Sequence, residues 1–302
     1  MKYLVTGGAG FIGSHLSETL LKNGHEVHVL DNFSTGLREN VPTGAILHEA
    51  DIRDFDAIAP LFKGVAVVFH EAALARVQPS IEDPRTSHEV NTTGTQNVLL
   101  AARNADVKRV VYAASASAYG DQETMPLVET MRPRPLSPYA LQKYSGELLC
   151  ELFSKIYKLE TISLRYFNVY GPRMPSIGSY ALAIGIFLGQ RKRGEPLTIV
   201  PDGTQARDFT HVRDIVNANI LAASSANVGN GEVINIGAGH KRTVLEIADL
   251  IGGPRVWIEP RIEPKAAEAD NKKAKELLGW KPEVKFEDGI AELKTLFGIT
   301  DR

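Results

Sequence analysis

The fold is decided by the opening stretch Lys2-Tyr3-Leu4-Val5-Thr6-Gly7-Gly8-Ala9-Gly10-Phe11-Ile12-Gly13. Residues 2–6 are a short apolar run, a helical pattern covers residues 14–23, and a second apolar run covers residues 26–30. This order predicts a βαβ unit with a glycine-rich turn between its first strand and its helix. Gly7, Gly10 and Gly13 would let the backbone approach a pyrophosphate at the helix N-terminus, as in dinucleotide sites. The alternative is a glycine turn that only closes a βα unit.

Asp31 ends the second apolar run of this unit. A carboxylate at that point can accept hydrogen bonds from both hydroxyls of an adenosine ribose. The same negative charge repels a ribose 2′-phosphate, so the pattern favours NAD over NADP.

Strand and helix patterns continue to alternate through the first half of the chain. Strands are predicted at 45–49, 65–70, 108–114 and 160–166, and helices at 54–62, 84–104 (interrupted at Asn91 and Gly94) and 138–157. Later helices are predicted near 179–192, 213–223 and 243–251, with short strands at 197–200, 232–236 and 255–257. We therefore expect an α/β fold with a doubly wound parallel sheet of the Rossmann type. Residues 1–165 would form its core and 166–302 mainly a smaller cap, with some later segments returning to complete the sheet.

Composition and charge exclude several classes of protein. The chain has 302 residues, of which 43% are hydrophobic and 23% charged, and its net charge is −2, so nothing indicates nucleic-acid binding. Cys150 is the single cysteine, so no intramolecular disulfide can form and a cytoplasmic location is expected. No leader segment and no apolar run of about 18 residues is present, so no membrane association is expected. The eight histidines lack metal-ligand spacing, so no metal site is expected.

Candidate catalytic residues stand at the end of one strand and the start of the next helix. Ser115 and Ser117 follow the 108–114 strand, and strand carboxyl ends carry the chemistry of doubly wound sheets. In the following helix, Tyr139 and Lys143 are one turn apart on the same face, and a cation beside a phenol lowers the pKa of that phenol. A surface helix also carries such a pair by chance. Combined with the glycine turn and Ser115, however, Tyr139 and Lys143 make up a hydride-transfer site in which Tyr139 moves the proton.

With these motifs in place, the chain resembles the extended short-chain dehydrogenase/reductase family, and within it the UDP-glucose/UDP-N-acetylglucosamine 4-epimerase group. The matching stretches are spread over the whole chain. They include residues 6–15, 30–32, 51–52, 115–120, 137–143, 164–173, 207–214 and 277–282.

The resemblance implies roles for further residues. At the adenosine and pyrophosphate end of bound NAD it places Phe11, Ile12, Asp31, Asn32, Ser34, Thr35 and Gly36, with Asp51 and Ile52 flanking the adenine. Further along the cofactor it places Ala72, Ala73, Ala75 and Asn91, and near the nicotinamide Tyr166 and Phe167. The diphosphate of a UDP-sugar substrate would contact Asn168, Arg207 and Arg261, with Ser115 and Ser117 toward the sugar. The resemblance also implies a homodimer in which the helices at 84–104 and 138–157 pair as a four-helix bundle.

The implied reaction is oxidation of the sugar at C4, rotation of the 4-keto sugar and reduction from the opposite face. Nucleotide-sugar dehydratases and decarboxylases of the family carry acidic residues just after the Ser115 position. Here Ala116 and Ser117 stand there, which favours epimerisation without elimination. By the same resemblance Ala267 controls the room at the sugar 2-substituent, and its small side chain predicts that N-acetylated UDP-hexoses are accepted. The alternatives are a UDP-glucuronate 4-epimerase, another nucleotide-sugar-modifying enzyme of the extended short-chain dehydrogenase/reductase family, and a non-catalytic NAD-binding scaffold.

Overall fold

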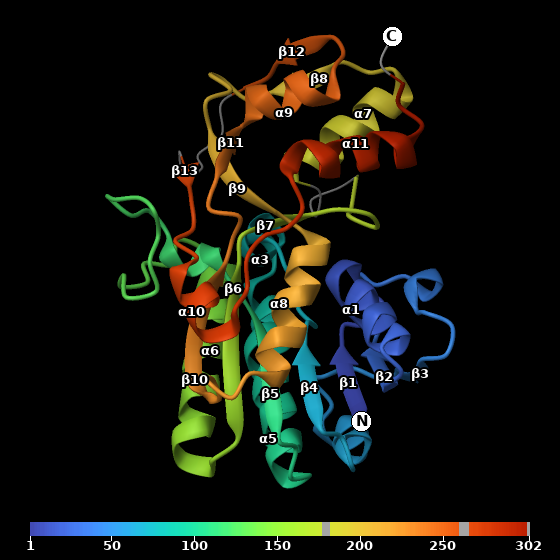
Figure 1. Cartoon of the computed structure of the whole chain (residues 1–302), viewed down its shortest axis with the longest axis vertical. Coiled ribbons are helices and arrows are strands. Elements are labelled where there is room, and N and C mark those ends of the chain that lie inside the picture. Colours follow the sequence, from blue (N-terminus) through green and yellow to red (C-terminus); the bar gives the residue numbers. More distant parts are fainter. Residues whose placement is uncertain (177–181, 260–265, 301–302) are drawn as a thin grey trace.

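The computed structural model describes residues 1–176, 182–259 and 266–300, and its centre is a parallel sheet in the order β10-β6-β5-β4-β1-β2-β3 (Figure 1). The strands are β1 (Lys2–Thr6), β2 (Glu26–Asp31), β3 (Ile46–Glu49), β4 (Val67–His70), β5 (Arg109–Ser115), β6 (Glu160–Tyr166) and β10 (Asn230–Ile236). The strand order reverses between β1 and β4, which confirms the predicted doubly wound sheet. The late strand β10 joins the sheet beside β6, as expected of a segment that returns to complete the core.

Helices cover both faces of this sheet. One face packs on α1 (Phe11–Lys22), α8 (Val212–Ser224) and α10 (Lys272–Leu278), which bury Leu16, Leu20, Ile215 and Leu278 against it. The other face packs on α5 (Thr95–Asn104) and α6 (Pro138–Tyr157). In the part of the chain that the structure describes, no helix could cross a membrane.

Three helices differ from the sequence prediction. The helix predicted at 54–62 is a short α2 (Phe55–Ile58) followed by a 3-10 turn, Ala59–Phe62, with Pro60 in its first turn. The helix predicted at 84–104 consists of α4 (Pro84–His88), a π-helical turn over Glu89–Gly94, and α5. The helix predicted from 179 is described from α7 (Ala183–Arg193), and residues 177–181 lie outside the described ranges.

The cap lies beyond the carboxyl ends of the core strands (Figure 1). A small sheet has the order β11-β9-β13, with β7 also beside β9, and β8 (Leu197–Ile199) pairs with β12 (Arg255–Trp257). The small sheet consists of β7 (Asn168–Tyr170), β9 (Ala206–His211), β11 (Lys241–Thr243) and β13 (Ala266–Ala267). Helices α7, α9 (Val244–Ile251) and α11 (Phe286–Phe297) bury a separate apolar cluster beside these strands.

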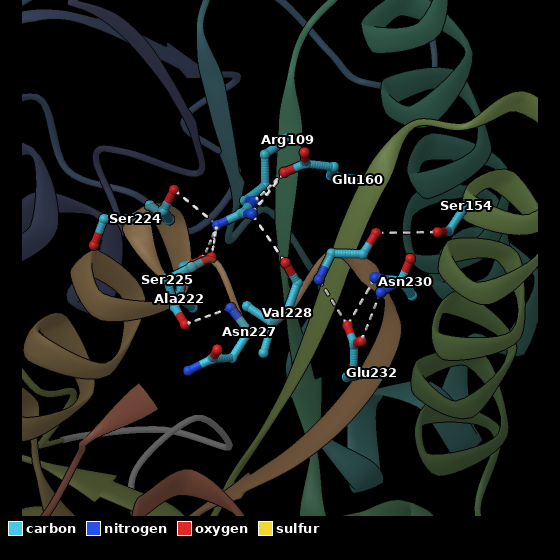
Figure 2. A network of polar contacts seen from close by, with 12 residues as sticks. Arg109, Ser154, Glu160, Ala222, Ser224, Ser225, Asn227, Val228, Asn230 and Glu232 are labelled. Atoms are coloured by element: carbon cyan, nitrogen blue, oxygen red, sulfur yellow. Dashed lines mark hydrogen bonds and ion pairs between the residues drawn. The ribbon is translucent and has the colours of Figure 1, made fainter. Parts of the chain in front are cut away.

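Arg109, at the start of β5, fastens the end of α8 to the core (Figure 2). Its Nη1 donates to the carbonyl oxygens of Ala222, Ala223 and Ser225 at 2.8, 3.0 and 2.9 Å, and its Nη2 donates to that of Val228 at 2.9 Å. The Glu160 carboxylate accepts from Arg109 Nε at 2.8 Å and balances the charge. Last-turn carbonyls of a helix lack intrahelical partners, so Arg109 serves as the cap of α8.

Candidate active site

Ser115, Tyr139 and Lys143 come together at the carboxyl end of β5. Ser115 is the last residue of that strand, and Lys143 Nζ donates to the carbonyl oxygen of Ala113 at 2.8 Å. Tyr139 and Lys143 occupy the first turns of α6, whose N-cap Ser137 accepts from the Ala140 N–H at 3.2 Å. Ser115 lies close enough to the Tyr139 hydroxyl to lower the pKa of that phenol, so the strand end and the helix meet at these two side chains.

The predicted lowering of the Tyr139 pKa by Lys143 is wrong for this structure, because the Lys143 ammonium donates to the Ala113 carbonyl oxygen and burial dominates the pKa of the phenol. Burial raises the pKa of the Tyr139 phenol, while Ser115 and the charge of Arg76 lower it. Burial lowers the pKa of Lys143 to about 8, against the raising effect of Glu71, Cys150 and Glu147. Lys143 therefore keeps most of its positive charge at neutral pH, next to the strand end that carries Ser115.

A second hydroxyl supports Ser115. The chain turns into a 3-10 helix, Ala116–Tyr119, for which Ser115 is the N-cap. The Ser117 hydroxyl donates to Ser115 Oγ at 2.9 Å, and the Ser117 N–H does so at 3.2 Å. Ser117 thus orients Ser115, and neither residue 116 nor residue 117 brings an acidic group to the site.

Two neighbouring helices position the start of α6. The Tyr139 N–H donates to Ser80 Oγ at 3.0 Å, and Ser80 belongs to α3 (Val77–Glu82), a helix that the sequence did not predict. Asn91 Nδ2 donates to Gln142 Oε1 at 2.8 Å and to the Leu74 carbonyl at 3.1 Å, while Asn91 Oδ1 accepts from the Leu74 N–H at 2.8 Å. Asn91, predicted to lie along the cofactor, is therefore also a bridge between α6 and the loop after β4.

The glycine turn is shaped to hold a dinucleotide. Gly7 has φ +69°, and a Cβ there would lie 2.7 Å from the Ala72 nitrogen; a Cβ on Gly13 would lie 2.3 Å from the Gly7 oxygen. Gly10 is the N-cap of α1 and offers no side chain to its first N–H groups. The first turn of α1, which includes Phe11 and Ile12, therefore has backbone N–H groups without a side-chain cap, as the predicted pyrophosphate site requires.

Asp31 connects that turn to the predicted adenosine end. Its Oδ2 accepts from the Ala9 N–H at 2.9 Å and its Oδ1 from the Phe33 N–H at 2.8 Å. These bonds fix the orientation of the carboxylate, and each of its oxygens can accept a further hydrogen bond, as the predicted contact with ribose hydroxyls requires.

The other residues predicted for that end lie around Asp31. Asn32 Nδ2 donates to Asp51 Oδ2 at 2.8 Å, the Ser34 N–H donates to Asn32 Oδ1 at 3.0 Å, and a Cβ on Gly36 would lie 3.0 Å from Asp31 Oδ1. Thr35 is exposed, whereas Ile52 is buried in the core, where a Cβ on Gly94 would lie 2.6 Å from its side chain. The loop after β4 carries Ala72, Ala73 and Ala75.

Glu71, a partly buried acidic residue near Lys143, was missed from the sequence. Glu71 follows β4, and its Oε1 accepts from the Tyr166 hydroxyl at 2.9 Å. Burial raises the pKa of Glu71 to about 7, against the lowering effects of Tyr166 and Lys143. The position of Glu71 directly after a buried strand was the sequence feature that could have identified it.

Phe167, predicted near the nicotinamide with Tyr166, packs in a small cluster with Tyr119 and Ala269.

The predicted substrate residues come from the small sheet of the cap. Asn168 opens β7 and its Nδ2 donates to the carbonyl oxygen of Asp208 at 3.3 Å, while Arg207 lies on β9 with Ala267 of β13 opposite it. Arg261 lies outside the described residues. Within the described ranges, no group of His, Cys, Asp or Glu side chains is arranged to hold a metal ion.

Comparison with known proteins agrees with this geometry. The model of the NAD dependent epimerase/dehydratase family matches residues 3–237. The chain is 37% identical to UDP-glucose 4-epimerase of Mycolicibacterium smegmatis over 315 residues, which cover 98% of each chain.

Solved structures show the same fold. UDP-glucose 4-epimerase of Thermotoga maritima with UDP-glucose has a TM-score of 0.93 at 37% identity, covering 99% of this chain and 98% of its own. UDP-N-acetylglucosamine 4-epimerase of Methanobrevibacter ruminantium, in complex with UDP-N-acetylmuramic acid, has a TM-score of 0.93 at 34% identity and coverages of 98% and 97%. UDP-glucuronic acid 4-epimerase of Bacillus cereus with UDP-glucuronic acid and NAD has a TM-score of 0.89 at 33% identity and coverages of 98% and 100%.

Proposed function

Because this chain belongs to the NAD-dependent epimerase/dehydratase family, as a nucleotide-sugar epimerase of the extended short-chain dehydrogenase/reductase type, we propose that it is a UDP-hexose 4-epimerase. It would interconvert gluco and galacto configurations and accept N-acetylated UDP-hexoses as well. The observation that carries the proposal is the meeting of Ser115, Tyr139 and Lys143 at the end of β5, with Ala116 and Ser117 next to them.

Bound NAD would take up the C4 hydride and return it to the opposite face of the sugar. The chain's own residues handle the proton. Tyr139 removes it from the C4 hydroxyl during oxidation and gives it back during reduction, while Ser115 hydrogen-bonds the C4 oxygen. Lys143 holds its positive charge at the end of β5 and, as the resemblance implies, would reach the ribose of the nicotinamide.

Elimination after oxidation needs a group that moves a proton at C5 or C6. The residues that follow Ser115 are Ala116, which has only a methyl group, and Ser117, whose hydroxyl donates to Ser115. Neither has a pKa suited to that proton transfer. The keto sugar is therefore returned to the reduced state rather than dehydrated.

A second candidate is 4-epimerisation of UDP-glucuronate. Arg76 is the residue that would pair with the uronate carboxylate, because its positive charge is close enough to Tyr139 to lower the pKa of that phenol. The likeness to the Bacillus cereus enzyme is compatible with both candidates.

Product analysis separates the candidates. The purified protein with NAD is incubated separately with UDP-glucose, UDP-N-acetylglucosamine and UDP-glucuronate, and the 4-epimers are resolved by chromatography. We expect turnover of the first two without added reductant. Turnover of UDP-glucuronate alone would favour the second candidate, and no interconversion of any of the three would reject both.

A further inference from the structure

Asp208 is a fully buried acidic residue directly beside Arg207 on β9. Successive side chains of a strand point to opposite faces, so Asp208 lies on the buried face of β9 and the partly buried Arg207 on the opposite face. Burying an ionised carboxylate is costly unless hydrogen bonds compensate for lost water. Its hydrogen-bond partners therefore indicate what this carboxylate holds together.

Three backbone N–H groups from two segments donate to this carboxylate. Oδ1 accepts from Ala238 at 2.8 Å, and Oδ2 accepts from Gly239 at 2.9 Å and from Ala269 at 3.1 Å. Ala238 and Gly239 follow β10 of the core sheet, and Ala269 follows β13 of the cap. One side chain thus joins the end of a core strand to the small sheet.

The junction is tightly packed. A Cβ on Gly237 would lie 2.3 Å from the Ala269 Cβ and 3.0 Å from Asp208 Oδ2. The Asp208 carbonyl accepts from Asn168, and β13 places Ala267 opposite Arg207. Three residues predicted to contact the UDP-sugar therefore surround Asp208. Arg207 precedes it on β9, Asn168 bonds its carbonyl from β7, and Ala267 pairs with Arg207 from β13.

We propose that Asp208 is a positioning residue for the nucleotide sugar, whose carboxylate fixes β9 and β13 against the end of β10 and so aligns Arg207 and Asn168. This inference rests on the proposed function. Asp208 acts through Arg207 and Asn168 and contacts no reacting atom.

Asp208→Asn keeps the size of the side chain. The carboxylate has two oxygens that accept from three backbone N–H groups, whereas the amide has only one oxygen. At least one backbone N–H loses its partner and faces an amide N–H₂ instead. We expect the dissociation constant for UDP to rise roughly tenfold, because Arg207 and Asn168 would lose their preorganised alignment and part of the binding free energy would be needed to restore it. The kcat at saturating UDP-sugar should stay within about twofold, because the reacting groups are untouched.

Asp214→Asn is the matched control. Asp214 is also buried, and its carboxylate accepts from the backbone N–H groups of Glu283 at 3.0 Å and Val284 at 3.2 Å, before α11. The UDP dissociation constant is measured by calorimetry on the NAD-loaded wild type and both variants, with Tm recorded for each. We expect both variants to lose Tm and only Asp208→Asn to lose UDP affinity. Equal affinity losses in the two variants, or wild-type affinity in Asp208→Asn, would overturn the proposal.

If Asp208→Asn does not fold, hydrogen exchange on the wild type decides. Positioning is reciprocal, so UDP should slow exchange of the Ala238, Gly239 and Ala269 amides more than that of Glu283 and Val284. Equal slowing, or none, would overturn the proposal. A wild type that does not bind UDP at all would instead contradict the proposed function.

Discussion

The Tyr166 hydroxyl donates a 2.9 Å hydrogen bond to the Glu71 carboxylate, although β5 separates their two strands in the sheet. Asn219 Nδ2 of α8 donates to the same hydroxyl at 2.7 Å. Glu71 in turn raises the pKa of Lys143. The hydrogen bond between the ends of β4 and β6 therefore holds the carboxylate that raises the pKa of Lys143 on α6.

Glu71→Gln should shift the pH profile of the reaction. The substitution keeps an acceptor for Tyr166 but removes a negative charge near Lys143, so the Lys143 pKa should fall below about 8. If the protonated lysine is required, the alkaline limb of the kcat/KM profile should move to lower pH. Glu26→Gln, an exposed carboxylate on β2, is the control. An unchanged alkaline limb would contradict this role of Glu71.

The same variant should change how stability depends on pH. The pKa of Glu71 is raised in the folded protein to about 7, so its contribution to stability is fully present below its unfolded pKa and is lost as pH rises through 7. Glutamine does not titrate. The Tm of Glu71→Gln relative to the wild type should therefore increase between pH 5 and 8, which a thermal melt series measures. A constant Tm difference would show that folding does not raise the pKa of Glu71.

Tyr139→Phe should reduce kcat roughly a thousandfold, the usual effect of removing a general acid–base group. The fold and NAD content should be preserved, because the ring and the backbone bond to Ser80 remain. Tyr157→Phe, at the exposed end of the same helix, is the matched control. Substantial activity in Tyr139→Phe would assign the proton transfer to another group.

Ala267→Tyr should separate the two substrate classes. A large ring beside Arg207 should remove activity on UDP-N-acetylglucosamine and spare activity on UDP-glucose, as measured by initial rates on each. Ala266→Tyr places the same ring on the opposite face of β13. Equal loss of both activities in Ala267→Tyr would refute the idea that this residue sets the room at the sugar 2-substituent.

One face of α6 predicts a dimer. Leu141, Leu148, Leu152 and Ile156 are 46–59% exposed and repeat at helical spacing, an arrangement typical of interfaces. We expect the wild type to be a dimer in light scattering and Leu148→Glu with Leu152→Glu to be a monomer. Leu296→Glu, on the exposed face of α11, should remain dimeric. A monomeric wild type would reject the four-helix bundle.

Local patterns were sufficient for the core of the fold and for the placement of Ser115, Tyr139 and Lys143. The alternation of strands and helices predicts the sheet, and parallel strands bring their carboxyl ends to one edge. The small sheet was not predictable, because β7, β9, β11 and β13 have six residues or fewer and pair across long sequence separations. The Glu71–Tyr166 contact depends on side-chain direction across an intervening strand, which no local pattern specifies.

The π-helical turn at Glu89–Gly94 determines how many residues the segment between β4 and β5 contains. Such a turn holds one residue more than an α-helical turn, so deleting a single residue there would restore a regular helix. Both kinds of turn complete one revolution about the helix axis, so Pro84–His88 would keep its orientation relative to α5, and Ser87 would still accept from Gln142 Nε2. The extra residue widens the turn that contains Asn91, whose amide bonds Gln142 and Leu74. A one-residue gap in this stretch therefore marks relatives that lack the widened turn around Asn91 but keep the Ser87 contact with α6.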